Sequence, residues 1–517
     1  LSARMLENLK VYLKRVQHGV HFSMFTEVTL QKLFMKFKSI LFVLAFCSCF
    51  LWSVPLLAQE FKGKIVDATT QEPIGYATVQ LSPTYGVITN QEGYFSLLQK
   101  DFSDATLVHI SHIGYEAIAI TIKELSQKQV IALKPSSTML NEVVLGPTLT
   151  ASQILQKYID HSKKNHAFSA MKVRYFSRGK ESFVPKKFEI DLKKVSFANK
   201  KELQKKIDDF EKKFNNKEIS SFTEIMTDVY STSKGVVANN LKALKLVDDK
   251  GLNMDNFQEK FFEHTFQQLE SPYTYRIKTG IIGLEKDASM KNISQEAKAA
   301  DTLKNNNGFY VLSYGMITHR EFISKRDIYE YKLQGTRMMN GMLCYHLTFS
   351  PDKNRAKYVG ELYINTDDFG LVYYNYQLAP DKSEFSLNLK WVLGVKFDSF
   401  DDRMEVLMQK SPSGTYYPQL IKRMNASYVY VDRSLTLTEN HPNRSERKKM
   451  KFNFLVEMIT STDDEIIAVA MEPHDPEVKI TPPPYILYDV KKRYDPNYWS
   501  DYTILEATEA LKNFKGE

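Results

Sequence analysis

Short runs of alternating apolar and polar residues, separated by turn residues, fill the chain from Phe61 to about residue 135. In residues 77–81, for example, apolar side chains at the odd positions alternate with threonine and glutamine at the even ones. A two-residue period places the apolar side chains on one face of a strand. Strands this short, with glycine, proline, asparagine and aspartate between them, are typical of a small β-sandwich. The pattern predicts such a sandwich over residues 59–135.

One turn of this region is specified by its side chains. Residues 89–95 read TNQEGYF. An asparagine side chain bonds readily to the backbone nearby, and glycine adopts positive φ angles at no steric cost. We therefore expect Asn90 and Gly93 to reverse the chain into a strand that starts at Tyr94.

Longer alternating runs fill residues 309–471, which predicts long antiparallel strands. Residues 358–379 predict a β-hairpin around residues 366–370, with Gly370 at the positive-φ position of its turn. Polar and apolar residues alternate on its first arm, so one face is expected to be buried and the other wet. The acidic run Asp463-Asp464-Glu465 stands between apolar runs and is expected to form a hairpin turn.

Two segments have the period of an amphipathic helix. Residues 150–164 open with Thr150 and Gln153, the spacing of a capping box, and carry apolar side chains on one side. Residues 200–214 repeat apolar side chains at helical spacing between charges of both signs. This second helix could serve a partner or a membrane, but its short apolar stripe favours a surface helix packed on its own domain. Residues 215–305 predict mixed helix and loop.

Together these patterns predict a mainly β protein, in which a small N-terminal β-sandwich is followed by a larger α+β domain with an antiparallel sheet; a resemblance given below implies that this is a curved antiparallel sheet. Residues 35–58 have the layout of a signal peptide, with a basic head at Lys36 and Lys38, an apolar run, and Ala58 before a polar break. The alternatives are a retained membrane anchor, because the run approaches the roughly 20 residues that span a bilayer, and a lipoprotein attached at Cys49. The expected segments are an upstream over-translation at 1–34, the signal peptide at 35–58, the sandwich at 59–135, a linker at 136–149, a helical and mixed region at 150–305, and a sheet domain with a C-terminal segment at 306–517.

The net charge weighs against nucleic-acid binding once the N-terminal segment is set apart. The chain of 517 residues has 69 basic and 61 acidic residues, a formal charge of +8. Residues 1–58 hold seven of the basic and two of the acidic residues, which leaves 62 basic and 59 acidic residues and a charge of +3. A charge this small is not the basic footprint of a nucleic-acid-binding protein.

The motifs of the common catalytic and cofactor sites do not occur in the chain. There is no H-E-x-x-H zinc motif, G-x-S-x-G nucleophile elbow, phosphate-binding P-loop or G-x-G-x-x-G sequence. His109 and His112 lie three residues apart on a predicted strand, so their side chains are expected on opposite faces, where they cannot share a metal. Cys344 is the one cysteine outside residues 35–58, which excludes a disulfide framework. We therefore predict no catalytic, cofactor-binding or metal-binding residues and no cofactor.

Five short motifs follow one another in residues 63–115: Gly63-Lys64-Ile65-Val66-Asp67, Glu72-Pro73-Ile74, Ala77-Thr78-Val79, Thr89 to Phe95, and Ser111-His112-Ile113-Gly114-Tyr115. Their order resembles the carboxypeptidase regulatory-like domain, a transthyretin-like β-sandwich. The chain departs from the family at Gln71, where glycine is frequent, and at Asn90, where aspartate is usual; both residues still suit a turn. The resemblance implies an accessory β-module, not the catalytic domain of a metallocarboxypeptidase, and an exported protein of the bacterial envelope.

A second set of residues lies in and around the predicted hairpin: Tyr345, Phe349, Pro351, Gly360, Leu362, Tyr363, Ile364, Thr366 and Asp368. These residues resemble the curved antiparallel sheet of outer-membrane lipoprotein carriers. The region as a whole resembles envelope proteins of unknown function that carry the same N-terminal module. The resemblance implies a half-barrel with an apolar concave face. Residues 494–499 resemble the closing segment of the same envelope proteins, and Trp499 is expected to pack on the main sheet.

These expectations favour a non-enzymatic, exported cell-envelope protein with an interaction or apolar-ligand or lipid-binding role, either periplasmic or associated with the outer membrane. Its expected partners are an envelope protein or a lipid, and no nucleic acid; the oligomeric state stays open. One alternative is an envelope hydrolase, because a catalytic triad is assembled from distant residues and needs no local motif. Another is a small outer-membrane barrel, although lysine and acidic residues stand where lipid would need apolar ones.

Overall fold

The structure is a computed structural model, in which most of the chain from Gln59 to Phe514 is described. The predicted over-translation at 1–34 and signal peptide at 35–58 lie outside the described residues. The described part is mainly β, as the sequence predicts. None of its helices combines the length and the apolar character that crossing a bilayer requires. The described residues are 59–99, 102–136, 149–166, 170–247, 269, 271–279, 286–288, 302–304, 311 and 317–514.

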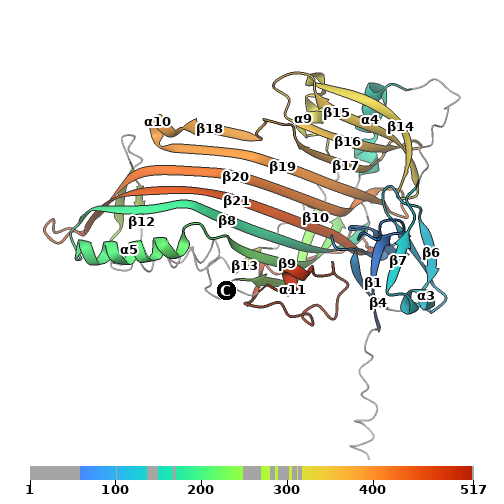
Figure 1. Ribbon diagram of the computed structural model, residues 1–517, viewed down its shortest axis with the longest axis horizontal. Coiled ribbons are helices and arrows are strands. Elements are labelled where there is room, and N and C mark those ends of the chain that lie inside the picture. The colour runs from blue at the N-terminus through green and yellow to red at the C-terminus, as the bar shows by residue number, and fades with distance from the viewer. Residues whose placement is uncertain are drawn as a thin grey trace, which may run out of the picture. The chain divides into compact units, whose positions relative to one another are not determined.

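The N-terminal module is a β-sandwich of two sheets (Figure 1). One sheet has the order β4-β1-β7, with β1 and β7 parallel, and the other has the antiparallel order β3-β2-β5-β6. Ile65 from the first sheet and Val79 and Val108 from the second are fully buried, which confirms the predicted sandwich. The elements are β1 (Gln59–Asp67), β2 (Thr78–Ser82), β3 (Tyr85–Ile88), β4 (Tyr94–Gln99), β5 (Leu107–Ser111), β6 (Ile118–Thr121), α3 (Ile122–Gln127) and β7 (Val130–Leu133).

The turn before β4 forms as predicted. Oδ1 of Asn90 accepts hydrogen bonds from the backbone N–H groups of Glu92, at 3.0 Å, and Tyr94, at 2.9 Å. Gly93 has a φ of 79°. A Cβ atom at this position would also come within 2.5 Å of the carbonyl oxygen of Ile65, so glycine is needed for space as well as for conformation.

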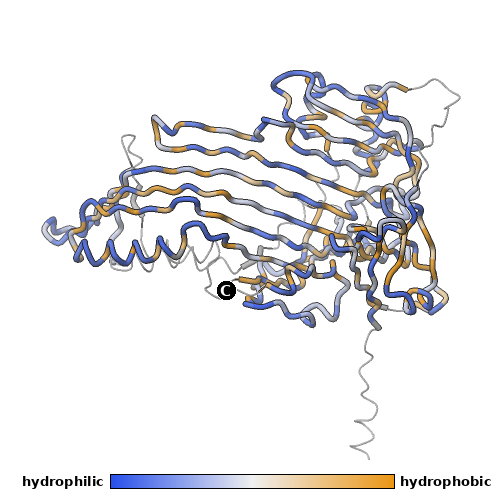
Figure 2. Tube along the Cα trace, in the orientation of Figure 1, coloured by the Kyte–Doolittle hydropathy of each residue, from blue (hydrophilic) through white to orange (hydrophobic). Residues whose placement is uncertain are grey.

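A second, larger sheet is antiparallel in the order β14-β15-β16-β17-β19-β20-β21-β8-β9-β10. Its long strands bend along their length (Figure 1), and apolar and polar residues alternate along them (Figure 2). This is the predicted curved antiparallel sheet. Its strands are β8 (Met171–Val195), β9 (Ile219–Thr232), β10 (Gly235–Leu246), β14 (Tyr329–Met339), β15 (Met342–Pro351), β16 (Tyr358–Asn365), β17 (Leu371–Leu378), β19 (Val395–Lys410), β20 (Tyr416–Glu439) and β21 (Lys449–Pro473).

Shorter elements extend this sheet at its margins. β18 pairs with the first residues of β19, β11 with the last residues of β20, and β23 runs parallel to the end of β10. β12 pairs with β11, whereas β13 and β22 form a separate two-stranded sheet. The remaining elements are β11 (Tyr275–Thr279), β12 (Lys286–Ala288), β13 (Thr302–Lys304), α9 (Glu321–Ser324), η3 (Arg326–Ile328), β18 (Phe385–Leu389), α10 (Lys390–Leu393), β22 (Tyr485–Leu487), β23 (Asp489–Lys491) and α11 (Glu509–Lys512).

Two predictions about this sheet are wrong. Residues 219–232 and 235–246 form β9 and β10, although mixed helix and loop were expected over 215–305. Asp463-Asp464-Glu465 lies inside β21 and does not form a turn. The physical reason is that basic residues on the neighbouring strands face these acids: Lys422 and Arg423 on β20, and Arg178 and Lys180 on β8. Opposite charges across a strand pair stabilise a sheet that the acids alone would disfavour.

The predicted hairpin of β16 and β17 forms, but Gly370 has a different role from the expected one. Phe369 takes the positive φ, at 57°. A Cβ atom on Gly370 would lie 2.2 Å from a ring carbon of Tyr416. Glycine is therefore required here by the close approach of the Tyr416 ring, not by the backbone conformation of the turn.

The first predicted helix is α4 (Ala151–Asn165), and its cap forms as expected. The hydroxyl of Thr150 accepts from the N–H of Gln153, and the Gln153 side chain accepts from the N–H of Thr150. Tyr158 is fully buried on the apolar side of α4. At the end of the helix, the Asn165 amide donates to the carbonyl oxygen of Asp368, which ties α4 to the hairpin turn.

The second predicted helix, α5 (Lys200–Phe214), serves as the edge partner of β8. β9 pairs with β8 only as far as Phe183. Beyond that point, Gln204 of α5 accepts from the N–H of Leu192 and donates to the carbonyl of Ile190. Glu211 accepts from the N–H of Ile190 at 2.6 Å. These side chains satisfy backbone groups that would otherwise form an open sheet edge. The apolar side of α5 packs on β8 and β21, which confirms a surface helix packed on its own domain.

Loss of the Glu211 proton is expected to make the protein less stable at higher pH. Partial burial raises the pKa of this carboxyl to about 7, from an ordinary value of 4.5. The folded state then binds more protons than the unfolded state between these two values, so stability is highest at the acidic end and falls as the pH rises toward 7. In urea unfolding at pH 5 and pH 8, Glu211→Gln should lose less stability between the two pH values than the wild type. The exposed Glu202→Gln on the same helix is the control; an equal loss in all three proteins would contradict the assignment.

Candidate functional site

Five charged side chains of alternating sign cross the larger sheet in direct register. Glu405 is opposite Lys422, Lys422 is opposite Glu465, Glu465 is opposite Arg178, and Arg178 is opposite Glu224. Residues directly opposite each other on neighbouring strands point to the same face. These five residues, one each from β19, β20, β21, β8 and β9, form what we call the charge ladder.

The two ends of the charge ladder are held by ion pairs. Nζ of Lys422 lies 3.0 Å from Oε2 of Glu405 in a partly exposed pair. Nη2 of Arg178 lies 2.6 Å from Oε1 of Glu224, and both side chains are almost completely buried. A buried ion pair contributes to stability only when its remaining donors and acceptors are also satisfied.

The N-terminal module contacts the charge ladder through Tyr76. Its hydroxyl donates to Oε1 of Glu465 at 2.7 Å, and Nζ of Lys422 lies 3.8 Å from the centroid of its ring. Burial, followed by the charge of Glu465, raises the pKa of the Tyr76 hydroxyl, so it stays protonated and acts as a donor. One aromatic side chain thus contacts two neighbouring charges of the ladder.

The C-terminal segment satisfies the other end of the charge ladder. The Arg178 guanidinium donates to the carbonyl oxygens of Leu505, at 2.9 Å, and Glu506, at 3.1 Å. The indole N–H of Trp499 donates to Oε2 of Glu224 at 2.6 Å. Trp499 is 2% exposed and packs edge-on against Phe176 of β8. The prediction that Trp499 packs on the main sheet is confirmed. Each side-chain nitrogen of Arg178 and each carboxylate oxygen of Glu224 has a hydrogen-bond partner.

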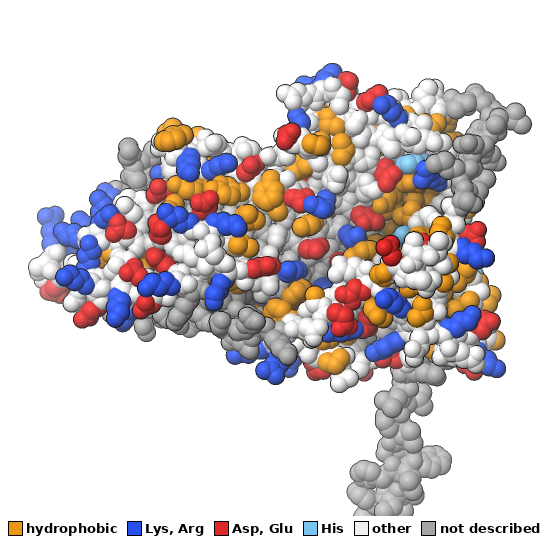
Figure 3. All heavy atoms as spheres, in the orientation of Figure 1, with side chains coloured by type: hydrophobic (Ala, Val, Ile, Leu, Met, Phe, Trp, Pro, Cys, Tyr) orange, Lys and Arg blue, Asp and Glu red, His pale blue; other side chains and the backbone are white. Residues whose placement is uncertain are grey.

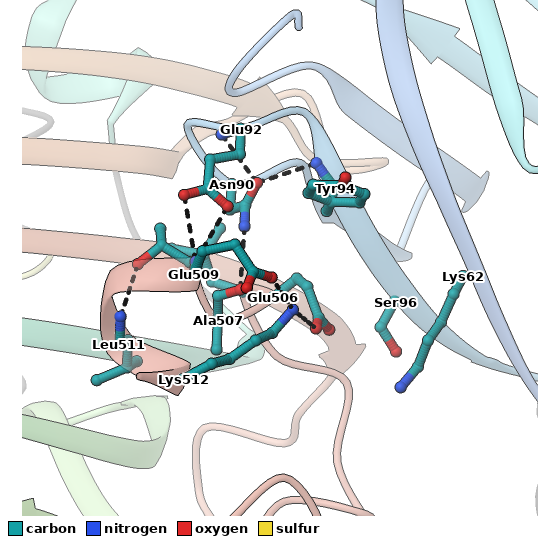
Figure 4. A network of polar contacts seen from close by, with 12 residues as sticks. Lys62, Asn90, Glu92, Tyr94, Ser96, Glu506, Ala507, Glu509, Leu511 and Lys512 are labelled. Carbon is teal, nitrogen blue, oxygen red and sulfur yellow. Dashed lines mark hydrogen bonds and ion pairs between the residues drawn. The ribbon is translucent and has the colours of Figure 1, made fainter. Parts of the chain in front are cut away.

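The N-terminal module also binds the C-terminal segment directly (Figure 4). Nδ2 of Asn90 donates to the carbonyl oxygen of Ala507 at 3.3 Å, and the Glu92 carboxylate accepts from the N–H of Glu509 at 3.1 Å. Nζ of Lys512 pairs with Glu506, at 3.4 Å, and with Glu509, at 3.2 Å. An aspartate at position 90 has no N–H to offer Ala507, so this contact needs asparagine.

Polar side chains continue the row of the charge ladder onto β17 and β16. Asn375 is opposite Glu405, and Glu361 is opposite Asn375. The Asn375 amide donates to Glu361 at 2.8 Å, and the Tyr373 hydroxyl donates to Glu405 at 3.2 Å. Nε2 of His346 lies 2.6 Å from Oε2 of Glu361, and this hydrogen bond lowers the pKa of the Glu361 carboxyl. The row of charged and polar side chains thus spans seven strands.

A cavity of about 510 Å³ opens beside the charge ladder, between the N-terminal module and the larger sheet. Tyr76 and Gln91 of the module form one side of it. The sheet side carries both signs of charge, and the pairs Lys422–Glu405 and Arg403–Asp401 neutralise each other along it. The sheet side includes Asn375, Gln377, Arg403, Glu405, Lys422 and Asp463.

Within the part of the chain that the structure describes, the histidines and Cys344 do not assemble a metal or nucleophile site. His109 lies exposed on β5, and His112 follows the end of that strand. Cys344 is a buried free thiol, and burial raises its pKa, which keeps it protonated and unreactive. A glutamate stands three residues after a histidine, the H-x-x-E spacing of some zinc sites, at His474 and Glu477; both follow the end of β21. Across the described residues, no three histidine, cysteine or acidic side chains are grouped as metal ligands.

The face of the larger sheet opposite the charge ladder carries partly exposed apolar side chains over β18, β19 and β20. Leu387, Phe397 and Val429 are opposite one another in one row, and Leu389, Val395 and Val431 in the next. Leu387 is 38% exposed and the other residues of the two rows are partly exposed; Phe385, two residues before Leu387 on the same face of β18, is 56% exposed. Val429 and Val431 lie an odd number of residues from Lys422, which places them on the other face of β20. We call this surface the apolar strip; it comprises Phe385, Leu387, Leu389, Val395, Phe397, Val429 and Val431.

Comparison with known proteins identifies the N-terminal module. Residues 61–145 match the model of the CarboxypepD_reg-like domain family. The module is a carboxypeptidase regulatory-like domain. Through Tyr76, Asn90 and Glu92, this domain supplies the contacts to the charge ladder and to the C-terminal segment.

The chain also shows distant likenesses to solved structures. No curated protein matches the chain. A DUF1329 family protein from Desulfovibrio piger is 11% identical, with 64% of this chain and 96% of that one covered and a TM-score of 0.18. A chain of the Pseudomonas aeruginosa MucA/MucB complex is 11% identical, with 63% of this chain and 99% of that one covered and a TM-score of 0.17. A membrane-associated protein of unknown function from Bacteroides fragilis is 8% identical, with 80% of this chain and 97% of that one covered and a TM-score of 0.12. TM-scores this low carry no argument about function.

Glu224→Gln should strongly destabilise the protein, because it leaves the Arg178 charge buried beside a neutral partner. Breaking a buried ion pair by removing one partner costs about 3–5 kcal/mol. The control is Glu218→Gln, which removes an exposed partner of Lys180 on the same pair of strands and should cost at most about 1 kcal/mol. Urea unfolding measures both variants. Equal losses would show that the charge ladder gains nothing from its burial.

Proposed function

We propose that this protein is a non-enzymatic, exported protein of the cell envelope that binds an apolar ligand, such as the acyl chain of a lipid, on the apolar strip. The observation that carries the proposal is the exposure of two cross-strand rows of apolar side chains on β18, β19 and β20. A carboxypeptidase regulatory-like domain and a predicted signal peptide at 35–58 support the export of the chain.

The chemistry of the apolar strip suits a hydrocarbon chain. Contiguous exposed apolar surface on a soluble protein marks a binding or interaction site more often than scattered apolar residues do. Phe385 and Phe397 lie with their ring centroids 5.9 Å apart, so the strip has aromatic as well as aliphatic side chains. Each methylene group that leaves water on such a surface contributes about 0.8 kcal/mol. A ligand with a long unbranched chain would gain most from two parallel rows.

Polar side chains in the cavity and beside it give weaker support for binding over catalysis. Glu361 and Glu405 are held by hydrogen bonds from neighbouring side chains, and Lys422 is paired, so these groups already have partners within the protein. The competing hydrolase hypothesis predicts turnover of peptide, ester or glycoside substrates by the purified protein. A turnover that responds to substitution of Glu361 would replace the proposal.

The test combines lipid analysis with a pair of matched variants. Extraction of the purified protein followed by mass spectrometry should reveal a bound lipid, and a fluorescent fatty acid should bind the delipidated protein. Phe385→Ser with Leu387→Ser should weaken fatty-acid binding by about tenfold, since two exposed side chains of the apolar strip lose their contact with the ligand. The control is Leu107→Ser with Val130→Ser, two similarly exposed apolar residues of the carboxypeptidase regulatory-like domain, and its affinity should be unchanged. Absence of bound lipid together with equal affinities in both variants would refute the proposal.

A further inference from the structure

Like charges are placed directly opposite each other at the end of the sheet far from the N-terminal module. Lys451 of β21 is in register with Lys194 of β8, and Lys449 follows two residues earlier on the same face of β21. The N–H of Lys449 donates to the hydroxyl of Ser196 at 2.8 Å, which holds these two strand ends together. Like charges opposite each other destabilise a sheet unless something neutralises them.

Acidic side chains of the described chain do not neutralise this cluster. Residues 186–201 contain six lysines and two acids, and residues 443–451 contain five basic residues and one acid. Each segment thus has a net charge of +4, although residues 59–517 together have only +3. Lys187 and Lys193 pair with the two acids of the first segment. Among the described residues, Lys194, Lys449 and Lys451 have no ion pair with an acid. Figure 3 shows lysine and arginine side chains gathered at this end of the sheet, beside α5.

An exposed tryptophan lies toward the same end of the molecule. Trp391 is 97% and Val392 is 77% exposed, and both belong to α10, the turn between β18 and β19. Figure 1 shows α10 and the connection between β20 and β21 on the same side of the sheet, away from the N-terminal module. A nearly fully exposed tryptophan is costly in water, but its amphipathic ring is favoured at the headgroup level of a membrane.

We propose that this end of the protein docks on a bilayer surface with anionic headgroups. Lys194, Lys449 and Lys451 would face the headgroups, while Trp391 and Val392 enter the interface. Cations alone would bind any polyanion; the exposed apolar turn toward the same end favours a lipid surface, because it gains free energy only where hydrocarbon is within reach. The inference does not rest on the proposed function, since none of these five residues belongs to the apolar strip.

Vesicle co-sedimentation of the full chain tests the proposal. The protein should bind vesicles of phosphatidylcholine with about one third phosphatidylglycerol, should bind pure phosphatidylcholine far more weakly, and should dissociate as salt rises. A lysine near an anionic surface contributes about 1 kcal/mol, or about fivefold in partitioning. Lys194→Gln with Lys449→Gln and Lys451→Gln should therefore lose about 100-fold. Lys123→Gln with Lys128→Gln and Lys134→Gln removes the same charge from exposed positions of the N-terminal module and should stay within twofold.

Tryptophan fluorescence supplies an independent readout. Trp499 is buried and Trp52 belongs to the predicted signal peptide, so the part of the blue shift on vesicle addition that disappears in Trp391→Phe is the part that Trp391 supplies. Equal binding to neutral vesicles, an equal loss in the two lysine triples, or an unshifted Trp391 emission during binding would each overturn the proposal. Binding of soluble polyphosphate without binding of anionic vesicles would overturn it too, because the site would then recognise charge alone.

Discussion

The alternation of opposite charges in direct register across five neighbouring strands is the constraint on which the rest of this structure depends. The side-chain period of a strand is two residues, so a one-residue slip of any of these strands would move its ladder charge to the other face. A slip of β21 would bring Asp464 to the position of Glu465. A slip of β8 or β9 would break the buried pair of Arg178 and Glu224. Removing a charge from water without its partner costs several kcal/mol, so the ladder fixes the register of the long strands as firmly as their apolar faces do.

The same row of charges brings the two ends of the described chain together. The Tyr76–Glu465 contact joins residues 389 positions apart, and the contact of Arg178 with Glu506 joins residues 328 positions apart. Both contacts use a side chain of the ladder, Glu465 of β21 in the first and Arg178 of β8 in the second. The N-terminal module and the C-terminal segment also bond to each other through Asn90 and Ala507. The two ends of the described chain are therefore bonded both to the ladder and to each other.

Features set by neighbours in the chain could be predicted from the sequence, and those set by distant strands could not. The Asn90 turn and the Thr150 cap depend on side chains bonding to the backbone a few residues away, and both form as predicted. Asp463 to Glu465 resembled a turn because the cations that make a strand possible there lie on β20 and β8. No ladder residue could be singled out beforehand, since each is an ordinary surface charge until five separate strands are aligned. Gly370 shows the same limit: its need for space comes from Tyr416, 46 residues later in the chain.

The two faces of the long strands differ in how completely the protein covers them. On the ladder face, the charges are satisfied by the N-terminal module, by the C-terminal segment and by one another. On the other face, Val456 of β21 is buried beneath the cluster that α5 completes, while Val431 and Val395, which continue the same row, are only partly buried. The row stays apolar beyond the part that α5 covers. Lys396 and Tyr430, the intervening residues on the same strands, point to the ladder side and are polar. Solvent alone would favour polar residues at these positions, so the continuation of the apolar rows is the feature that a bound hydrocarbon chain accounts for.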